Sequence, residues 1–251
     1  MIFGHASITG KVREKNEDSV LALQYVEILE GKKEERFLGA VADGMGGGEY
    51  GEIASKIAIE SLRSIAVEPL LKDGCNLNDI TGRLRKSYES ANSDILSYSM
   101  THSIRLMGTT ATSIFICGYN ATIGNIGDSR TYIFDSKGSL KFVTRDHSYV
   151  QELIDAGQVS EMEGRTDPRR NQLTRSIGIE EECLPDFYTV KIEKGYSILL
   201  CSDGYWDSMS DHEIGNYIAK DIPVQKIVEN LAHLANERDG TDNISLLLIK
   251  L

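Results

Sequence analysis

The sequence predicts an α+β fold in which antiparallel sheet is covered by helices. Short β-branched segments follow one another after residue 108 and are separated by Gly, Asn and Asp, which is typical of antiparallel strands joined by turns. Long amphipathic segments occur in adjacent pairs, which argues against a regular βαβ alternation. The 251 residues, 41% of them hydrophobic, contain no repeat or linker, so we expect one domain that spans residues 1–251.

The first part of the chain is expected to contain two strands and two helices. Residues 19–23 and 36–42 are predicted strands. Between residues 51 and 66 the apolar side chains recur with the helical period of 3.6, which predicts an amphipathic helix. The same period predicts a second helix over residues 77–100. We expect these neighbouring helices to form a pair.

Most of the remaining elements are predicted strands. They cover residues 111–117, 121–126, 131–134, 140–143, 187–190, 196–201 and 244–249. Helices are expected at residues 149–156, after the capping box Ser210-Asp211-His212-Glu213, and at residues 224–236. The segment 157–178 has weak periodicity and several charges, and internal loops of this length are usually functional or mobile.

Three apolar runs, far apart in the sequence, border on an aspartate. Asp43 follows the run that ends at Ala42, Asp203 follows the run around Leu199, and Asp242 precedes the last predicted strand. A carboxylate at the end of a buried strand is costly unless a cation pairs with it. A hard divalent cation requires oxygen ligands that converge on one point. Metal-dependent chemistry is therefore the first functional hypothesis.

Each aspartate also has a simpler interpretation when it is considered alone. Asp43 precedes a glycine-rich stretch that could approach a ligand closely, and the Gly44 carbonyl could be an oxygen ligand. Asp203 is likewise followed by a glycine, and Asp207 lies four residues further on. Asp-Gly is, however, a common turn signal that needs no ligand. The combination of three such aspartates favours the metal site.

Composition restricts the classes of partner. Acidic residues outnumber basic ones 38 to 27, for a net charge of −11, so we expect no nucleic-acid partner. The N-terminus lacks a basic and apolar leader, and no apolar run is long enough to span a membrane, so we expect a cytoplasmic protein with no membrane partner. The cysteines form no C-x-x-C pair and are expected to be thiols in a reducing compartment; they are Cys75, Cys117, Cys183 and Cys201.

Eight short motifs occur in order along nearly the whole chain. They are Arg13-x-x-Asn16-Glu17-Asp18, Val41-Ala42-Asp43-Gly44-Met45-Gly46-Gly47, Gly108-Thr109-Thr110-Ala111, Asn125-Ile126-Gly127-Asp128-Ser129-Arg130, Asp146-His147-Ser148, Leu173-Thr174-Arg175-Ser176-Ile177-Gly178, Cys201-Ser202-Asp203-Gly204-Tyr205-Trp206-Asp207 and Asp242-Asn243-Ile244-Ser245. Any one of them is a weak signal, but eight in order are specific. The chain resembles the metal-dependent Ser/Thr protein phosphatases of the 2C type (the PPM family), in their bacterial form.

The resemblance implies a four-layer αββα sandwich of two stacked antiparallel sheets flanked by helix pairs. Two Mn²⁺ or Mg²⁺ ions would lie between the sheets. Asp43 would bridge both ions, the Gly44 carbonyl would complete the shell of one, and Asp203 and Asp242 would bind the other. Asp18 would orient metal-bound water.

The resemblance also implies supporting residues and a weaker third metal site. Asp128, together with Asp203 or Asp207, would form this third site. Glu17 and Asn243 would support the ligands of the first two ions.

The implied activity is hydrolysis of phosphoserine and phosphothreonine in proteins by direct attack of a metal-bridging hydroxide. Two cations about 3.5–4 Å apart lower the pKa of water and offset phosphoryl charge. Arg13 is expected to hold the phosphate, because a guanidinium binds it bidentately. Met45 replaces a histidine of eukaryotic relatives that can protonate the leaving group, so no general acid is assigned. The substrates would come from a cognate Ser/Thr kinase, and we expect a monomer.

Two other functions share these features. A pseudophosphatase would bind phosphoproteins without hydrolysing them, but no expected aspartate is missing. A nuclease or nucleotide phosphatase could also use two metals, although the acidic composition argues against nucleic acid. The segment 157–178 corresponds to the family's flap, and it is either a solvated loop or a docking site for phosphopeptides through Arg165, Arg169, Arg170 and Arg175.

Overall fold

Two antiparallel sheets form the centre of the molecule, which the computed structural model describes over residues 1–46, 50–71 and 76–251. The first sheet has the order β1 (Ile2–Ile8), β11 (Ile244–Lys250), β10 (Ser197–Cys201), β7 (Arg130–Phe134) and β8 (Leu140–Val143). The second has the order β2 (Asp18–Leu29), β3 (Lys32–Met45), β5 (Ala111–Cys117), β6 (Asn120–Ile126) and β9 (Asp186–Lys191), and β4 (Gly108–Thr109) pairs with the end of β3.

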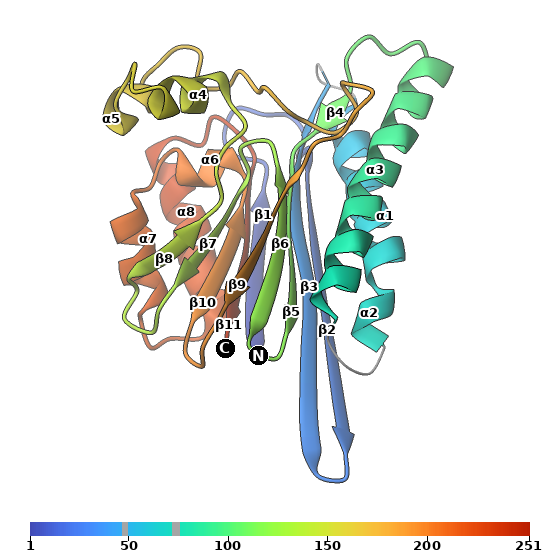
Figure 1. The fold of residues 1–251 in the computed structure, drawn as a ribbon. Coiled ribbons are helices and arrows are strands. Elements are labelled where there is room, and N and C mark those ends of the chain that lie inside the picture. The colour runs from blue at the N-terminus through green and yellow to red at the C-terminus, as the bar shows by residue number, and fades with distance from the viewer. Residues whose placement is uncertain (47–49, 72–75) are drawn as a thin grey trace.

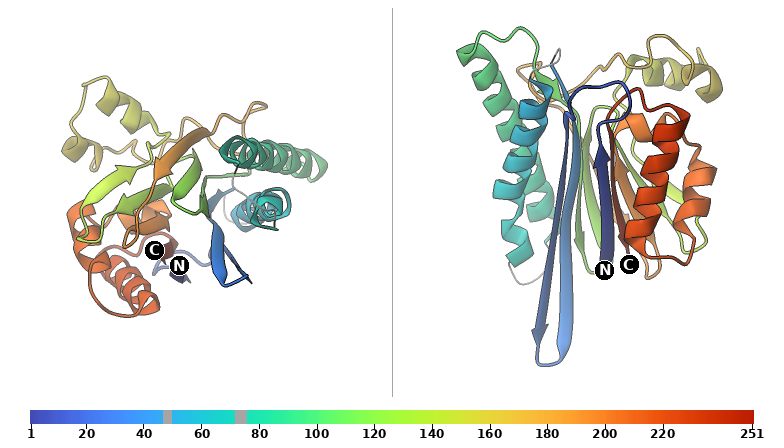
Figure 2. Two further views of the ribbon diagram at one scale, coloured as in Figure 1. Left: turned by 60° about the horizontal axis from the view of Figure 1, so that its bottom comes forward. Right: turned by 180° about the vertical axis from the view of Figure 1, so that it is seen from behind.

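Helices cover the outer face of each sheet, so the predicted αββα sandwich is confirmed (Figures 1 and 2). The second sheet is covered by α1 (Gly51–Ala66), α2 (Glu68–Leu71) and α3 (Leu77–Thr101). The first is covered by α6 (Asp203–Trp206), α7 (Asp211–Ile218) and α8 (Val224–Arg238). The short helix α4 (Tyr149–Asp155) precedes the flap, and α5 (Glu161–Gly164) lies within it, both at one end of the sandwich (Figure 1). No helix in the described part of the chain is long and apolar enough to span a bilayer.

Strand β11 shows how the layers are held together. Leu246 and Leu248 pack against α8 in one buried apolar cluster. Leu247 and Ile249 point the other way and contact the second sheet in another cluster. Because side chains alternate along a strand, a strand buried on both faces must be apolar at every position. The continuous apolar run near the C-terminus is therefore an interior strand.

Most predicted elements are found close to their expected bounds. The helix at residues 51–66 and the strand at residues 111–117 match α1 and β5. The capping box before α7 is present, with Ser210 and Glu213 each bonded to the other's backbone N–H. The strands expected at residues 19–23 and 36–42 are too short, because β2 and β3 continue into a long hairpin that projects from the body (Figure 1).

Other expectations are wrong or cannot be assessed. Strand β1 was not expected, and Asp203 opens a one-turn helix where a hairpin turn was the simpler alternative. Cys117 is disulfide-bonded, so the expectation of four thiols is wrong at that position. Gly47 and Gly48 of the glycine-rich motif, as well as Cys75, lie outside the described residues.

Candidate metal and phosphate site

The acidic residues predicted from sequence meet at the end of the sandwich where β3 and β10 end and β2 and β11 begin. Asp18 is the first residue of β2, and the register of the hairpin places it directly opposite Asp43 on β3. Asp203 follows β10, and Asp242 precedes β11, which is paired with β10. Chain segments that are far apart in sequence therefore bring four carboxyl groups to one place.

These residues surround a cavity of about 570 Å³. Among the described lining residues there is one cation, Arg13, and there are five carboxyl groups, from Glu17, Asp43, Asp128, Asp203 and Asp242. The Asp18 carboxyl lies just behind this lining and is buried. An excess of acid in a partly buried site is unfavourable unless a cation is present.

Burial and mutual repulsion raise the pKa of these carboxyl groups. Burial raises the pKa of Asp18 to about 7, although hydrogen bonds from Ser245 and Ser202 oppose the shift. Burial and the charge of Asp242 raise the pKa of Asp203 to about 6. The pKa of Asp43 is also raised, first by burial and then by the charges of Asp18 and Asp203. Each shift shows that the ionised form lacks sufficient countercharge from the protein.

Three of the buried carboxylate oxygens that have no hydrogen-bond partner among the described residues belong to this site. They are Glu17 Oε1, Asp18 Oδ1 and Asp203 Oδ1. Buried oxygens of this kind are normally satisfied, so their orphaned state fits the binding of hard cations. No three described His, Cys, Asp or Glu side chains enclose one point by themselves.

Two serines that the sequence analysis missed hold Asp18 in place. Ser202 is fully buried, and its hydroxyl donates to Asp18 Oδ2 at 2.8 Å. The same hydroxyl accepts the backbone N–H of Ser245 at 3.0 Å. Both serines lie beside or within otherwise apolar strand segments. A polar residue in such a segment was the only sequence signal that could have indicated their role. The pair orients one Asp18 oxygen and leaves the other without a partner.

Asn243 fixes the loop that carries Arg13 and Glu17. Its side-chain oxygen accepts the backbone N–H of Glu17 at 2.8 Å. Its side-chain nitrogen donates to the carbonyls of Thr9 at 2.9 Å and Lys15 at 3.0 Å. Three hydrogen bonds involving one buried amide hold this loop in place, and the supporting role of Asn243 stays a prediction.

The glycines beside Asp43 allow two backbone segments to approach each other. A Cβ atom on Gly51, at the start of α1, would lie 2.6 Å from Glu17 Cδ and 2.8 Å from the Gly44 carbonyl oxygen. Only glycine fits this approach. Thr110 secures the strand on the other side, because its N–H donates to the Asp43 carbonyl at 2.9 Å and its hydroxyl accepts the Asp43 N–H at 3.2 Å.

Arg13 lies at the mouth of the cavity. Its side chain is 50% exposed and donates to Asp242 Oδ2 at 2.7 Å. A half-exposed guanidinium at this position can reach an anion that enters from solvent.

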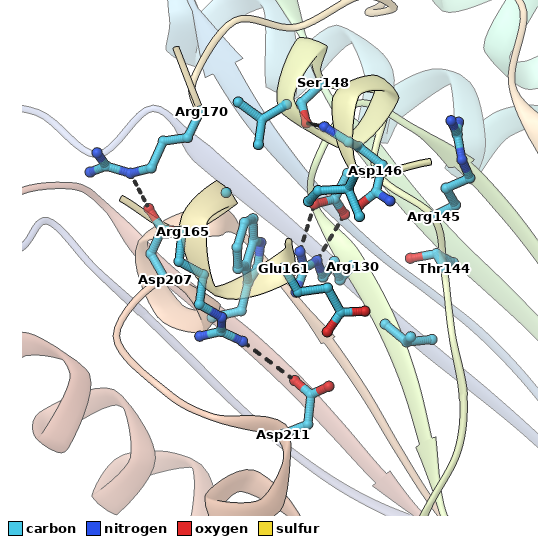
Figure 3. Close-up of a pocket in the computed structure, with 16 residues that line it drawn as sticks. Arg130, Thr144, Arg145, Asp146, Ser148, Glu161, Arg165, Arg170, Asp207 and Asp211 are labelled. Atoms are coloured by element: carbon cyan, nitrogen blue, oxygen red, sulfur yellow. Dashed lines mark hydrogen bonds and ion pairs between the residues drawn. The ribbon is translucent and has the colours of Figure 1, made fainter. Parts of the chain in front are cut away.

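Asp128 and Asp207 are placed differently. Asp128 is buried in the same cavity, where its pKa is raised by burial and then by the charge of Asp203. Asp207 lines a neighbouring cavity of about 290 Å³ and pairs with Arg170 at 3.4 Å (Figure 3). Of the two, Asp128 is the one that shares the cavity with the other proposed ligands.

The flap arginines do not gather at one point. Arg165 and Arg170 line the neighbouring cavity, where Arg165 lies 4.0 Å from Asp211 (Figure 3). Arg165 also donates to the Met209 carbonyl at 3.2 Å. Arg169 pairs with Asp167 at 2.8 Å. Arg175, together with His147, contacts Asp186.

At the floor of the neighbouring cavity, Arg130 binds Asp146 bidentately at 2.8 and 2.6 Å (Figure 3). Its guanidinium lies 3.5 Å from the centre of the Trp206 ring. This buried pair connects the flap side of the molecule to α6, which begins with Asp203.

Comparison with known proteins gives consistent matches. The family model of protein phosphatase 2C matches residues 5–244. Protein phosphatase PhpP of Streptococcus pneumoniae is 35% identical over 211 residues, which is 84% of each chain. The solved serine/threonine phosphatase of S. agalactiae is 31% identical with a TM-score of 0.87, covering 100% of this chain and 99% of that one. The catalytic domain of the phosphatase PstP, solved in complex with two manganese ions, is 30% identical with a TM-score of 0.80, covering 98% and 96%.

Proposed function

Because the chain belongs to the protein phosphatase 2C family, we propose that it hydrolyses phosphoserine and phosphothreonine in proteins with Mn²⁺ or Mg²⁺ as cofactor. The observation that carries the proposal is the cavity in which five carboxyl groups surround one guanidinium. Carboxylate oxygens suit hard divalent cations, and a guanidinium suits phosphate. Its relatives are named as bacterial Ser/Thr phosphatases, which agrees with this chemistry.

Two cations would be held by the residues around the cavity. Asp43 would bridge them, the Gly44 carbonyl would bind one, and Asp203 and Asp242 would bind the other. Bound cations of this kind supply water that ionises near neutral pH and countercharge for phosphoryl oxygens. Asp128 is better placed than Asp207 for a weaker third ion, because it shares the cavity with Asp203.

Asp18 and its serine partners would fix the position of the attacking water. One Asp18 oxygen is held by Ser202, so the other is oriented and available as an acceptor. A positioned acceptor aligns water for in-line attack on phosphorus, and positioning of this kind is a large part of phosphoryl-transfer catalysis.

Arg13 is the residue that would hold the phosphate. In the structure its guanidinium is engaged with Asp242 at 2.7 Å. When Asp242 serves as a metal ligand, less of its charge remains for Arg13, and the guanidinium can bind phosphate oxygens bidentately. Arg13 would therefore exchange Asp242 for the phosphate as its anionic partner.

We propose a cytoplasmic monomer of one catalytic domain that spans residues 1–251 and acts on the products of a Ser/Thr kinase. The net charge of −11 argues against a nucleic-acid substrate, as the nuclease alternative would require. The pseudophosphatase alternative is disfavoured because Asp18, Asp43, Asp203 and Asp242 are present and adjacent.

The test compares a phosphothreonine peptide, a nucleotide and a small aryl phosphate as substrates in Mn²⁺ buffer. Asp43→Asn should remove nearly all activity while circular dichroism shows a retained fold, because it takes away a bridging charge and little packing. Asp221→Asn, an exposed aspartate outside the cavity, is the matched control. Full activity of Asp43→Asn, or of the parent protein in excess chelator, would overturn the proposal.

A further inference from the structure

An apolar groove lies beside the proposed catalytic cavity. It has a volume of about 450 Å³ and lies between the C-terminal end of α3 and the segment that follows the flap. Figure 1 shows this end of α3 beside β4, at the same end of the sandwich as the flap. Leu96, Met100, Ile104, Leu106 and Ile179 supply its apolar walls.

The groove and the catalytic cavity share part of their walls. Leu106 and Ile179 line both of them. A chain that places a phosphate in the catalytic cavity therefore has its neighbouring residues at the entrance of the groove.

Apolar side chains in the groove are unusually exposed for their size. Met100 is 76% exposed and Leu106 is 54% exposed. Exposed apolar side chains that cluster beside a polar site commonly mark a surface that binds another molecule. Arg105 lies between these two residues in the wall and forms no ion pair among the described residues, which suits an anionic phosphopeptide.

The walls of the groove are fixed by the fold. Met107 and Ile177, next to the exposed residues, are each only 1% exposed and belong to the core. The backbone N–H of Gly178 donates to the Asn92 side chain at 2.6 Å, which ties the segment after the flap to α3. Gly178 has a φ of +88°, and a side chain there would overlap Ile95. A groove with anchored walls can bind without a large ordering cost.

We propose that this groove binds an apolar side chain of the phosphoprotein substrate, close in sequence to the phosphorylated residue. This specificity rests on the proposed phosphatase function. Because the groove and the cavity share Leu106 and Ile179, the apolar residue would be a near neighbour in sequence of the phosphorylated one in an extended peptide. The cavity would then bind the phosphate of a substrate segment, and the groove would bind an apolar neighbour in the same segment.

The test uses phosphothreonine peptides that differ only by leucine or serine at one position, scanned across those neighbours. For the parent enzyme we expect one position at which leucine raises kcat/KM about tenfold, the effect of burying one such side chain. Met100→Ser and Leu106→Ser should each reduce this preference severalfold. Each peptide rate is divided by the same enzyme's rate on a small aryl phosphate, so that a general loss of catalysis cancels.

Ile28→Ser is the matched control. Ile28 is 66% exposed on the β2–β3 hairpin, which projects from the body away from the flap and the groove (Figure 1). This variant should keep the full leucine preference.

Two results would overturn the groove proposal while leaving the phosphatase intact. One is equal cleavage of all peptides by the parent enzyme, and the other is a leucine preference that survives both groove substitutions. Dimerisation that Met100→Ser abolishes in size-exclusion chromatography would assign the groove to a second copy and also overturn it. Failure to cleave any phosphopeptide would defeat the proposed function itself, and the groove proposal with it.

Discussion

Replacing Asp203 by asparagine should stabilise the protein in the absence of metal. Burial and the charge of Asp242 raise the pKa of Asp203 from 3.8 to about 6, a shift of about two units. One unit corresponds to about 1.4 kcal/mol, so the ionised carboxylate destabilises the fold by at most about 3 kcal/mol. Because Asp203 is partly exposed, screening by solvent reduces this to about 2 kcal/mol. Asparagine keeps the shape of the side chain and removes the charge.

The sign of the effect depends on pH. The folded state holds the Asp203 proton more tightly than the unfolded chain, so the stability of the parent protein falls as pH rises from about 4 to about 6. The neutral asparagine has no such dependence. The advantage of Asp203→Asn is therefore complete above about pH 6 and disappears below about pH 4.

Thermal unfolding in excess chelator measures this advantage. At pH 8 a gain of about 2 kcal/mol corresponds to a rise in Tm of about 4–8 °C for a chain of this size. Mn²⁺ should then raise the Tm of the parent protein strongly and that of Asp203→Asn much less, because the variant lacks a ligand. The reasoning is refuted if the variant is the less stable protein in chelator at pH 8, or if Mn²⁺ shifts both proteins equally.

Three further predictions concern residues around the site. Ser202→Ala should lower the free energy of unfolding in urea by about 2 kcal/mol, because Asp18 loses a donor and the buried Ser245 N–H loses its acceptor; an unchanged midpoint would contradict this. Burial lowers the pKa of His147, so the parent protein should lose stability relative to His147→Gln as pH falls below about 6.5; parallel dependences of the unfolding free energy on pH, measured in urea, would contradict this. Arg170→Glu should raise KM for a phosphopeptide roughly fivefold and more than for an aryl phosphate, whereas an equal change on both substrates would exclude docking by this arginine.

The elements that sequence predicted well have strong periodic or turn signals of their own. Helix α1 shows the helical period over its whole length, and β5 ends at the turn formed by Gly118 and Tyr119. Strand β1 carries no such signal, because Gly4 and His5 interrupt it and its outer edge is unpaired. Its pairing with β11 makes it a strand, and the close approach of Gln225 requires the glycine at position 4. Only tertiary contacts could reveal it.

The residues of the candidate site also differ in how clearly the sequence predicts them. Three aspartates stand out in the sequence because each places a charge at the border of an apolar segment; they are Asp43, Asp203 and Asp242. Ser202 does not stand out, because serine is tolerated in buried strands. Its importance comes from the hydrogen bond that it donates to Asp18. The spacing between Asp203 and Asp207 in the sequence could not show which of the two cavities beside α6 Asp207 would line.

The distribution of charge in the cavity bears on both the proposed metal dependence and the proposed catalysis. Arg13 is the sole cation among the described lining residues, and it is already engaged with Asp242. Arg13 also acts on Glu17, and Arg130 acts on Asp128, but these cations do not balance the acidic charge. Burial and the charges of Asp18 and Asp203 therefore raise the pKa of Asp43. None of the five histidines lines the cavity, whereas Met45 does. In the proposed mechanism the described lining residues would provide metal ligands and a phosphate clamp but no imidazole acid, so the proton for the leaving oxygen would come from water or from another kind of group.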